Sequence, residues 1–148
     1  MPTVTRTMTV AAPPERLVEY LKDFANAEDW DSGTQRCTRN DTGPIKVGSS
    51  WHNVSKVFGV TAELTYTLEE LTRQTLVFVG TNARSTSRDT ITITGVDAGS
   101  LVTYRAELTM HGLAKLLNPI MKLAFDKLAD DTEKQMTKVL NALGSRER

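Results

Sequence analysis

Apolar residues recur at steps of three and four over residues 113–143, and the run ends at Gly144. This spacing places side chains on one face of an α-helix. Asn118 and Pro119 are typical of a helix cap and a first helical turn, so we expect an uninterrupted helix to begin there and to run about 25 residues. Residues 113–117 would then form a separate turn. A long amphipathic helix needs an extended apolar surface to cover its buried face.

Most of the chain before this helix alternates between apolar and polar side chains, which is the period of a β-strand. The strands that the alternation predicts are 4–10, 34–40, 49–58, 60–68, 76–82, 85–94 and 101–110. Between the first two, Pro14 followed by Glu15 indicates the first turn of a helix that runs to about Phe24. Residues 26–31 indicate a second, short helical turn.

The predicted order is therefore a strand, two short helices, a series of antiparallel strands and one long helix. This order is typical of an α+β fold in which the helices lie on one face of a single sheet. Antiparallel sheets twist and curl, and a helix laid on the concave side need not fill it, so a cavity can remain between the two. We expect one domain over residues 1–144 and a disordered polar tail over 145–148.

The charges are balanced, with 18 Lys and Arg residues against 18 Asp and Glu residues. A formal net charge of zero gives no overall electrostatic case for a nucleic-acid partner or an anionic membrane surface. The single cysteine, Cys37, excludes an intrachain disulfide and is ordinary for a reducing compartment. No stretch approaches the roughly 18 apolar residues of a membrane span. We therefore expect a soluble, cytoplasmic protein without stable membrane insertion, and the sequence leaves its oligomeric state open.

One carboxylate has an unusual predicted position, on the strand over residues 85–94. If Ile91 faces the helix, strict alternation also turns Asp89 inward, whereas a β-bulge would expose it. Burying a carboxylate without a partner costs several kcal/mol. Alternation along the first strand turns Arg6 inward as well, so Arg6 is one possible partner of Asp89. Water in a hydrated cavity is the other.

No familiar catalytic or metal-binding arrangement is present in the sequence. His52 and His111 are expected at the surface or at a strand end, and two histidines without a spaced carboxylate or cysteine do not make a metal site. Cys37 has no activating base nearby in sequence. Residues 43–50 resemble a phosphate-binding loop in spacing but lack its lysine. We expect no metal and no cofactor.

Five stretches carry a family resemblance. They are the opening strand running into Val10-Ala-Ala-Pro-Pro14, then Val18-Glu-Tyr-Leu-Lys-Asp-Phe24 with Trp30 after it, Gly48 leading into long strands, Tyr66-Thr-Leu-Glu-Glu70, and the closing helix. Together they resemble the START/Bet v 1-like (SRPBCC) superfamily, in particular its polyketide cyclase/dehydrase and lipid-transport group. The resemblance implies the helix-grip fold, a curved antiparallel sheet of six to seven strands wrapped around a long C-terminal helix. It also implies a pocket for a hydrophobic small molecule such as a lipid or an aromatic polyketide.

The covered faces supply the candidate ligand-binding residues, which would otherwise simply pack together as core. They are Trp30, Trp51, Leu64, Tyr66, Phe78, Tyr104, Leu108, Met110, Leu117, Met121, Phe125 and Leu128.

Three functions stay open at this point. The leading one is a carrier or binding protein for a mostly apolar molecule. The second is a cyclase or dehydrase, in which Asp89, Tyr66, Tyr104 or Arg6 would move protons. The third is an interaction module similar to chaperone-activator relatives. Residues 112–118 lie before the long helix, where a ligand could enter, and we expect them to be more mobile than the helix.

Overall fold

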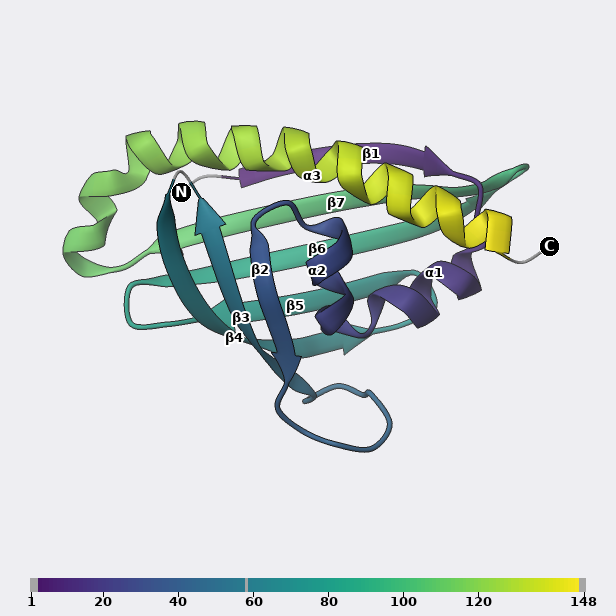
Figure 1. The fold of residues 1–148 in the computed structure, drawn as a ribbon, viewed down its shortest axis with the longest axis horizontal. Helices are drawn as coiled ribbons and strands as arrows, with labels where there is room; N and C mark the ends of the chain where they lie inside the picture. The colour runs from purple at the N-terminus through teal and green to yellow at the C-terminus, as the bar shows by residue number, and fades with distance from the viewer. Residues whose placement is uncertain (1–2, 58, 147–148) are drawn as a thin grey trace.

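The computed structural model describes residues 3–57 and 59–146 and consists of one curved sheet closed on one face by helices (Figure 1). The strands are β1 (Thr3–Val10), β2 (Thr34–Arg39), β3 (Ser50–Val57), β4 (Val60–Leu71), β5 (Thr75–Thr81), β6 (Ser85–Val96) and β7 (Gly99–Met110). The helices are α1 (Pro14–Leu21), the short 3₁₀ turn η1 (Phe24–Asn26), α2 (Ala27–Trp30), the 3₁₀ turn η2 (Gly112–Leu117) and α3 (Asn118–Arg146). The predicted α+β helix-grip fold is confirmed.

The sheet is antiparallel throughout, in the order β1-β7-β6-β5-β4-β3-β2. The first strand pairs with the last, and β2 to β7 follow one another as neighbours. This topology brings the ends of β3, β5 and β7 and the starts of β4 and β6 to one end of the sheet, which we call the front end. η2 and the start of α3 follow directly from β7 at this end (Figure 1).

The long helix begins at Asn118, where the cap and the first-turn proline predict it, and η2 is the separate turn before it. α3 has 29 residues rather than about 25 and reaches Arg146, beyond the predicted end at Gly144. The remainder of the predicted tail, 147–148, lies outside the described residues. In the part of the chain that the structure describes, no helix is both long and apolar enough to cross a membrane.

The tightly packed core lies at the opposite end, which we call the back end, under α1, η1, α2 and the second half of α3. An aromatic cluster centres on Phe24, whose ring centroid lies 4.5 Å from those of Phe78 and Tyr66. Trp51 packs edge-on against Phe78 at 5.7 Å. Ring pairs of this kind contribute about 0.5–1.5 kcal/mol each beyond the area that they bury. Leu140 and Met136 of α3 complete this core, and both are fully buried.

Candidate ligand pocket

The concave face of the sheet changes from sealed to accessible toward the front end. Along β6, the exposed fraction rises from 0% at Ile93 and Ile91 to 5% at Asp89, 7% at Ser87 and 8% at Ser85. The inward residues of β4 and β7 follow the same trend. Inward residues at the back end have no exposed surface, so the convex face of the sheet does not expose inward side chains. The exposed fraction at the front end therefore comes from the concave side. The inward side chains toward the front end are therefore slightly more accessible than those at the back end, which makes the space between the sheet and the front half of α3, as far as Asp89, the candidate pocket.

Asp89 points into this space, as strict alternation predicts. The pairing of β6 with β7 is unbroken from Ser85 opposite Met110 to Val96 opposite Gly99, so no bulge reverses the direction of its side chains. The Ser87 hydroxyl donates a hydrogen bond to Asp89 Oδ1 at 3.2 Å.

Burial decides the protonation state of Asp89. Removal from water and, to a smaller extent, the negative charge of Asp31 raise the pKa of the Asp89 carboxyl to about 8, against a smaller lowering by the Ser87 hydrogen bond. Asp89 is therefore largely protonated at neutral pH. In that state it can donate a hydrogen bond as well as accept one.

Two tyrosines share the closed end of the pocket with Asp89. Burial raises the pKa of both Tyr66 and Tyr104 well above the ordinary value, and the charge on Asp89 raises both further. Both phenols are therefore neutral hydrogen-bonding groups. The Ser87 hydroxyl, which donates to Asp89, lowers the pKa of Tyr66 by a smaller amount, so Tyr66, Ser87 and Asp89 form a cluster of polar groups across β4 and β6.

A glycine makes this arrangement possible. Gly80 of β5 lies opposite Tyr66 on one side and Ser87 on the other. A β-carbon at Gly80 would lie only 2.6 Å from the Tyr66 ring. The missing side chain therefore lets the ring lie across β5 and reach β6.

A second carboxylate, Asp31, follows α2 and was missed by sequence reasoning. Thr34 donates to Asp31 Oδ2 at 2.6 Å, and Thr132 of α3 donates to Asp31 Oδ1 at 3.0 Å. Burial still raises the pKa of Asp31 above its ordinary value. Asn53 extends the network by donating to Thr34 at 3.2 Å. Thr34 lies three residues from Asp31, a spacing visible in sequence, but Thr132 is 101 residues away and no local pattern indicates it.

Three predicted aromatic ligand residues lie in the packed cluster behind the pocket. Trp30, Trp51 and Phe78 are fully buried. Trp51 Nε1 donates to Asp23 Oδ1 at 3.0 Å. Trp30 packs edge-on against Tyr104 at 5.9 Å, and its Nε1 is the only buried side-chain polar atom without a partner among the described residues.

The other predicted lining residues divide by position. Leu64 and Leu108 are buried near the front end, and Met110 is partly exposed at the edge. Phe125 and Leu128 of α3 are partly buried above the sheet. The predicted side chains of Leu117 and Met121 lie outside the described residues.

Arg6 does not pair with Asp89, so that possible pairing is wrong. Arg6 Nη2 lies 2.8 Å from Asp130 Oδ1 of α3, and Glu133 is also within ion-pairing distance at 3.7 Å. The reason is the strand order. β7 separates β1 from β6, while α3 lies along β1 and offers its carboxylates directly.

The two histidines and the cysteine are the remaining candidates for chemistry. His52 contacts Glu63 at 2.8 Å, and His111 contacts Thr86 at 2.9 Å, both at the surface as predicted. Cys37 is buried, and burial raises its pKa to about 12, so it is not a thiolate nucleophile. Among the described residues, no group of three or more His, Cys, Asp or Glu side chains is placed to hold a metal ion.

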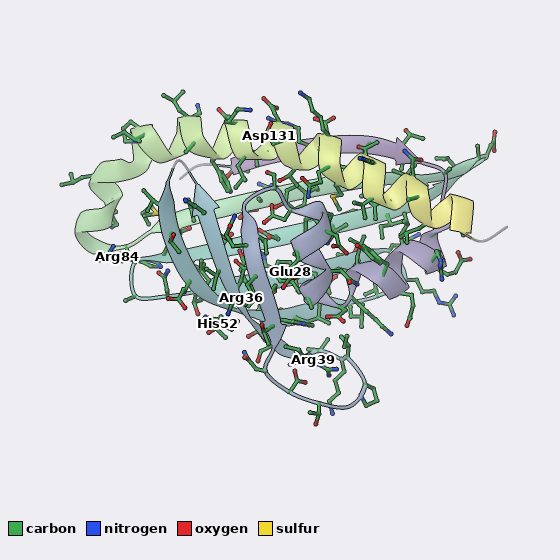
Figure 2. All side chains as sticks on the ribbon, in the orientation of Figure 1. Glu28, Arg36, Arg39, His52, Arg84 and Asp131 are labelled. Atoms are coloured by element: carbon green, nitrogen blue, oxygen red, sulfur yellow. The ribbon has the colours of Figure 1, made fainter. Side chains whose placement is uncertain are left out.

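An open surface groove of about 870 Å³ lies between α1, α2 and the back half of α3, with Tyr20, Glu28, Lys134 and Leu143 among its lining residues. Glu28 of α2 and Asp131 of α3, both labelled in Figure 2, line this groove. Its lining includes none of the pocket residues described above. The groove is therefore a separate, charged surface feature.

A curved antiparallel sheet, a long C-terminal helix that closes its concave face and two short helices after the first strand define a protein of the helix-grip class. The chain belongs to the polyketide cyclase/dehydrase and lipid transport family, whose sequence model matches residues 1–143.

Solved structures with the same fold are similar over almost the whole chain. The Zhui aromatase/cyclase from Streptomyces sp. R1128 superposes with a TM-score of 0.78 at 14% identity, covering 99% of this chain and 95% of that one. A START superfamily protein from Mycobacterium smegmatis gives a TM-score of 0.72 at 14% identity, with 99% of each chain covered. The di-domain ARO/CYC BexL gives 0.69 at 10% identity, over 93% of this chain and 49% of that one. No curated protein matches in sequence. At these identities the likeness concerns the fold.

Proposed function

We propose that this protein binds a largely apolar small molecule between the sheet and the front half of α3, as a binding or carrier protein. The observation that supports this proposal is the graded exposure of the concave face, which ends at Asp89, Tyr66 and Tyr104. A carboxyl group and phenols inside an apolar interior weaken a core unless they have a partner. An apolar pocket with a few convergent polar groups is the usual form of a small-molecule site.

The lining indicates the kind of ligand. Leu64, Leu108 and Phe125 offer apolar contact along the walls, so the body of the ligand should be hydrophobic. The closed end offers the protonated carboxyl of Asp89 and the phenol of Tyr104, both of which can donate a hydrogen bond. A ligand with a carbonyl or hydroxyl oxygen at its inner end matches these groups.

Two measurements test binding. Purified protein is denatured, extracted and analysed by mass spectrometry for a retained apolar molecule. The native protein is also titrated with N-phenyl-1-naphthylamine, whose fluorescence rises in an apolar site. We expect binding by the wild type. No retained molecule together with no change in probe fluorescence would overturn the proposal.

Two variants on the same strand, β7, test whether the probe binds on the concave face of the sheet. Leu108→Trp adds bulk on the concave face and should abolish probe binding, whereas Arg105→Trp adds the same group on the exposed convex face and should leave it unchanged. Thermal unfolding of both variants checks that the larger side chain is tolerated, since overpacking costs about 1–3 kcal/mol. Equal binding by both variants would place the probe elsewhere.

The cluster of Tyr66, Ser87 and Asp89 favours a second candidate, a cyclase or dehydrase that uses the same pocket. An acid with a pKa of about 8 can both give and take a proton near neutral pH. In that case, Asp89→Asn should retain probe binding and slow the turnover of a polyketide-like substrate by about 10²–10⁴-fold. Unchanged turnover in this variant would exclude Asp89 as the proton donor.

A further inference from the structure

The segments at the front end of the sheet carry more positive than negative charge. Residues 56–57, 59–61, 82–86 and 109–123 lie there, and they contain Lys56, Arg84 and two further lysines but no Asp or Glu. Figure 2 shows Arg84 at this end, near the turn that leads into the long helix. The N-terminus of α3 adds a partial positive charge from the aligned peptide dipoles. The overall charge of zero therefore conceals a local cationic region.

Large apolar side chains lie exposed in the same region. Leu116, Ile120 and Leu123 are 78%, 62% and 71% exposed, and their spacing of four and three residues places them on one side of η2 and the first turns of α3. Exposed lysines, Lys115 and Lys122, flank them. We call this set, together with Arg84, the front surface. The front of α3 projects beyond the strand ends, which makes this surface accessible (Figure 1).

We propose that the front surface docks on anionic phospholipid bilayers, so that the mouth of the pocket faces the lipid. Helical segments that combine exposed Leu or Ile side chains with flanking lysines bind at membrane interfaces through apolar burial and attraction to anionic headgroups. The inward side chains also become more accessible toward this same end, from Asp89, which is buried, to Met110, which is partly exposed. An apolar molecule could then pass between bilayer and pocket without crossing water.

A second copy of the chain fits this surface less well. A symmetric contact would bring one cationic patch against another, which is unfavourable. Three exposed apolar side chains are also a small part of the roughly 800 Å² that each partner contributes to a standard interface. A layer of anionic headgroups offers opposite charge and an apolar interior together. The docking does not depend on which ligand is bound, so it can be tested independently of the proposed function.

Vesicle flotation with the full chain tests the electrostatic part. We expect the wild type to float at low ionic strength with vesicles of phosphatidylcholine and phosphatidylglycerol, to stay in solution with phosphatidylcholine alone, and to release as salt is added. Lys115→Gln with Lys122→Gln should weaken binding about 25-fold, at about fivefold per lysine. The matched control is Lys134→Gln with Lys138→Gln, two exposed lysines on the back half of α3, which should bind like the wild type.

The apolar part has its own variants. Replacing Leu116, Ile120 and Leu123 by serine should abolish flotation, whereas Val96→Ser, at the exposed back-end hairpin, should not. Ile120→Trp provides a second readout that does not depend on the triple variant folding, since its emission should shift to the blue only with anionic vesicles.

Three results would overturn the proposal. One is a wild type that stays in solution with both kinds of vesicle, and another is an equal loss in the back-half lysine control. The third is a wild-type dimer by light scattering that the triple serine variant abolishes, which would assign the surface to a second copy.

Discussion

The buried carboxyl of Asp89 should make the protein less stable as the pH rises from about 5 to about 8. The folded pKa of about 8 lies above the ordinary value of 3.8. Over the range between them the folded state holds a proton that the unfolded state has released. The free energy of unfolding therefore falls with increasing pH through this range and levels off above it.

The size of the effect follows from the same two values. They differ by about four pH units, and each unit corresponds to about 1.36 kcal/mol, so Asp89 should account for about 5 kcal/mol between acid and alkaline pH. This is comparable with the whole stability of many domains, which is about 5–15 kcal/mol. Asp31, whose pKa is also raised by burial, acts in the same direction in the wild type.

The variant Asp89→Asn separates the contribution of Asp89 from that of Asp31, because the amide of Asn stays neutral at every pH. Urea denaturation at intervals from about pH 5 to pH 9 should give the smallest difference in stability between wild type and variant at the acid end. At the alkaline end, the variant should be more stable by several kcal/mol. Asp97→Asn, at an exposed position of the β6–β7 hairpin, is the control and should follow the wild type. Parallel pH profiles for wild type and Asp89→Asn would refute the reasoning.

Three further predictions test the packing around the pocket. Gly80→Ala should lower the free energy of unfolding by about 1–3 kcal/mol, because its β-carbon would meet the Tyr66 ring; an unchanged denaturation midpoint would contradict that contact. Cys37 should react with a thiol reagent only as fast as the protein unfolds, because it is buried and its pKa is raised to about 12; rapid labelling of native protein would show the thiol to be accessible. Arg6→Met should cost less than about 1 kcal/mol in urea denaturation, because the ion pair with Asp130 is partly exposed, and a larger loss would show that the pair is better shielded from water.

The elements of the fold were predictable because their signals are local. Alternation located all seven strands, and Asn118 with Pro119 located the start of the long helix. The inward direction of Asp89 also followed from alternation, since β6 contains no bulge. The same argument would have failed across the irregularity in β4 between Leu68 and Glu70, where the pairing with β5 shifts.

The composition of the pocket was less predictable because it depends on contacts between distant segments. The partner of Arg6 is set by the order of strands and by the position of α3, and it lies 124 residues away in sequence. The role of Gly80 depends on the residue across the strand, because the space that it leaves is occupied by Tyr66. Phe78 is completely covered because Phe24 and Trp51 pack against it, whereas Leu108 remains 8% exposed. The predicted mobility of residues 112–118, which comprise η2 and the first residue of α3, stays a prediction.

The pairing of β1 with β7 also determines the order in which the molecule can be assembled. β1 is matched along its length, from Thr3 opposite Glu107 to Val10 opposite Ser100, so it has no strand partner until β7 has been synthesised. Contacts between such distant segments slow folding, because a long loop must close before they form. During that interval Val4, Met8 and Val10 remain uncovered on a nascent chain, where they present a surface for chaperones or for aggregation.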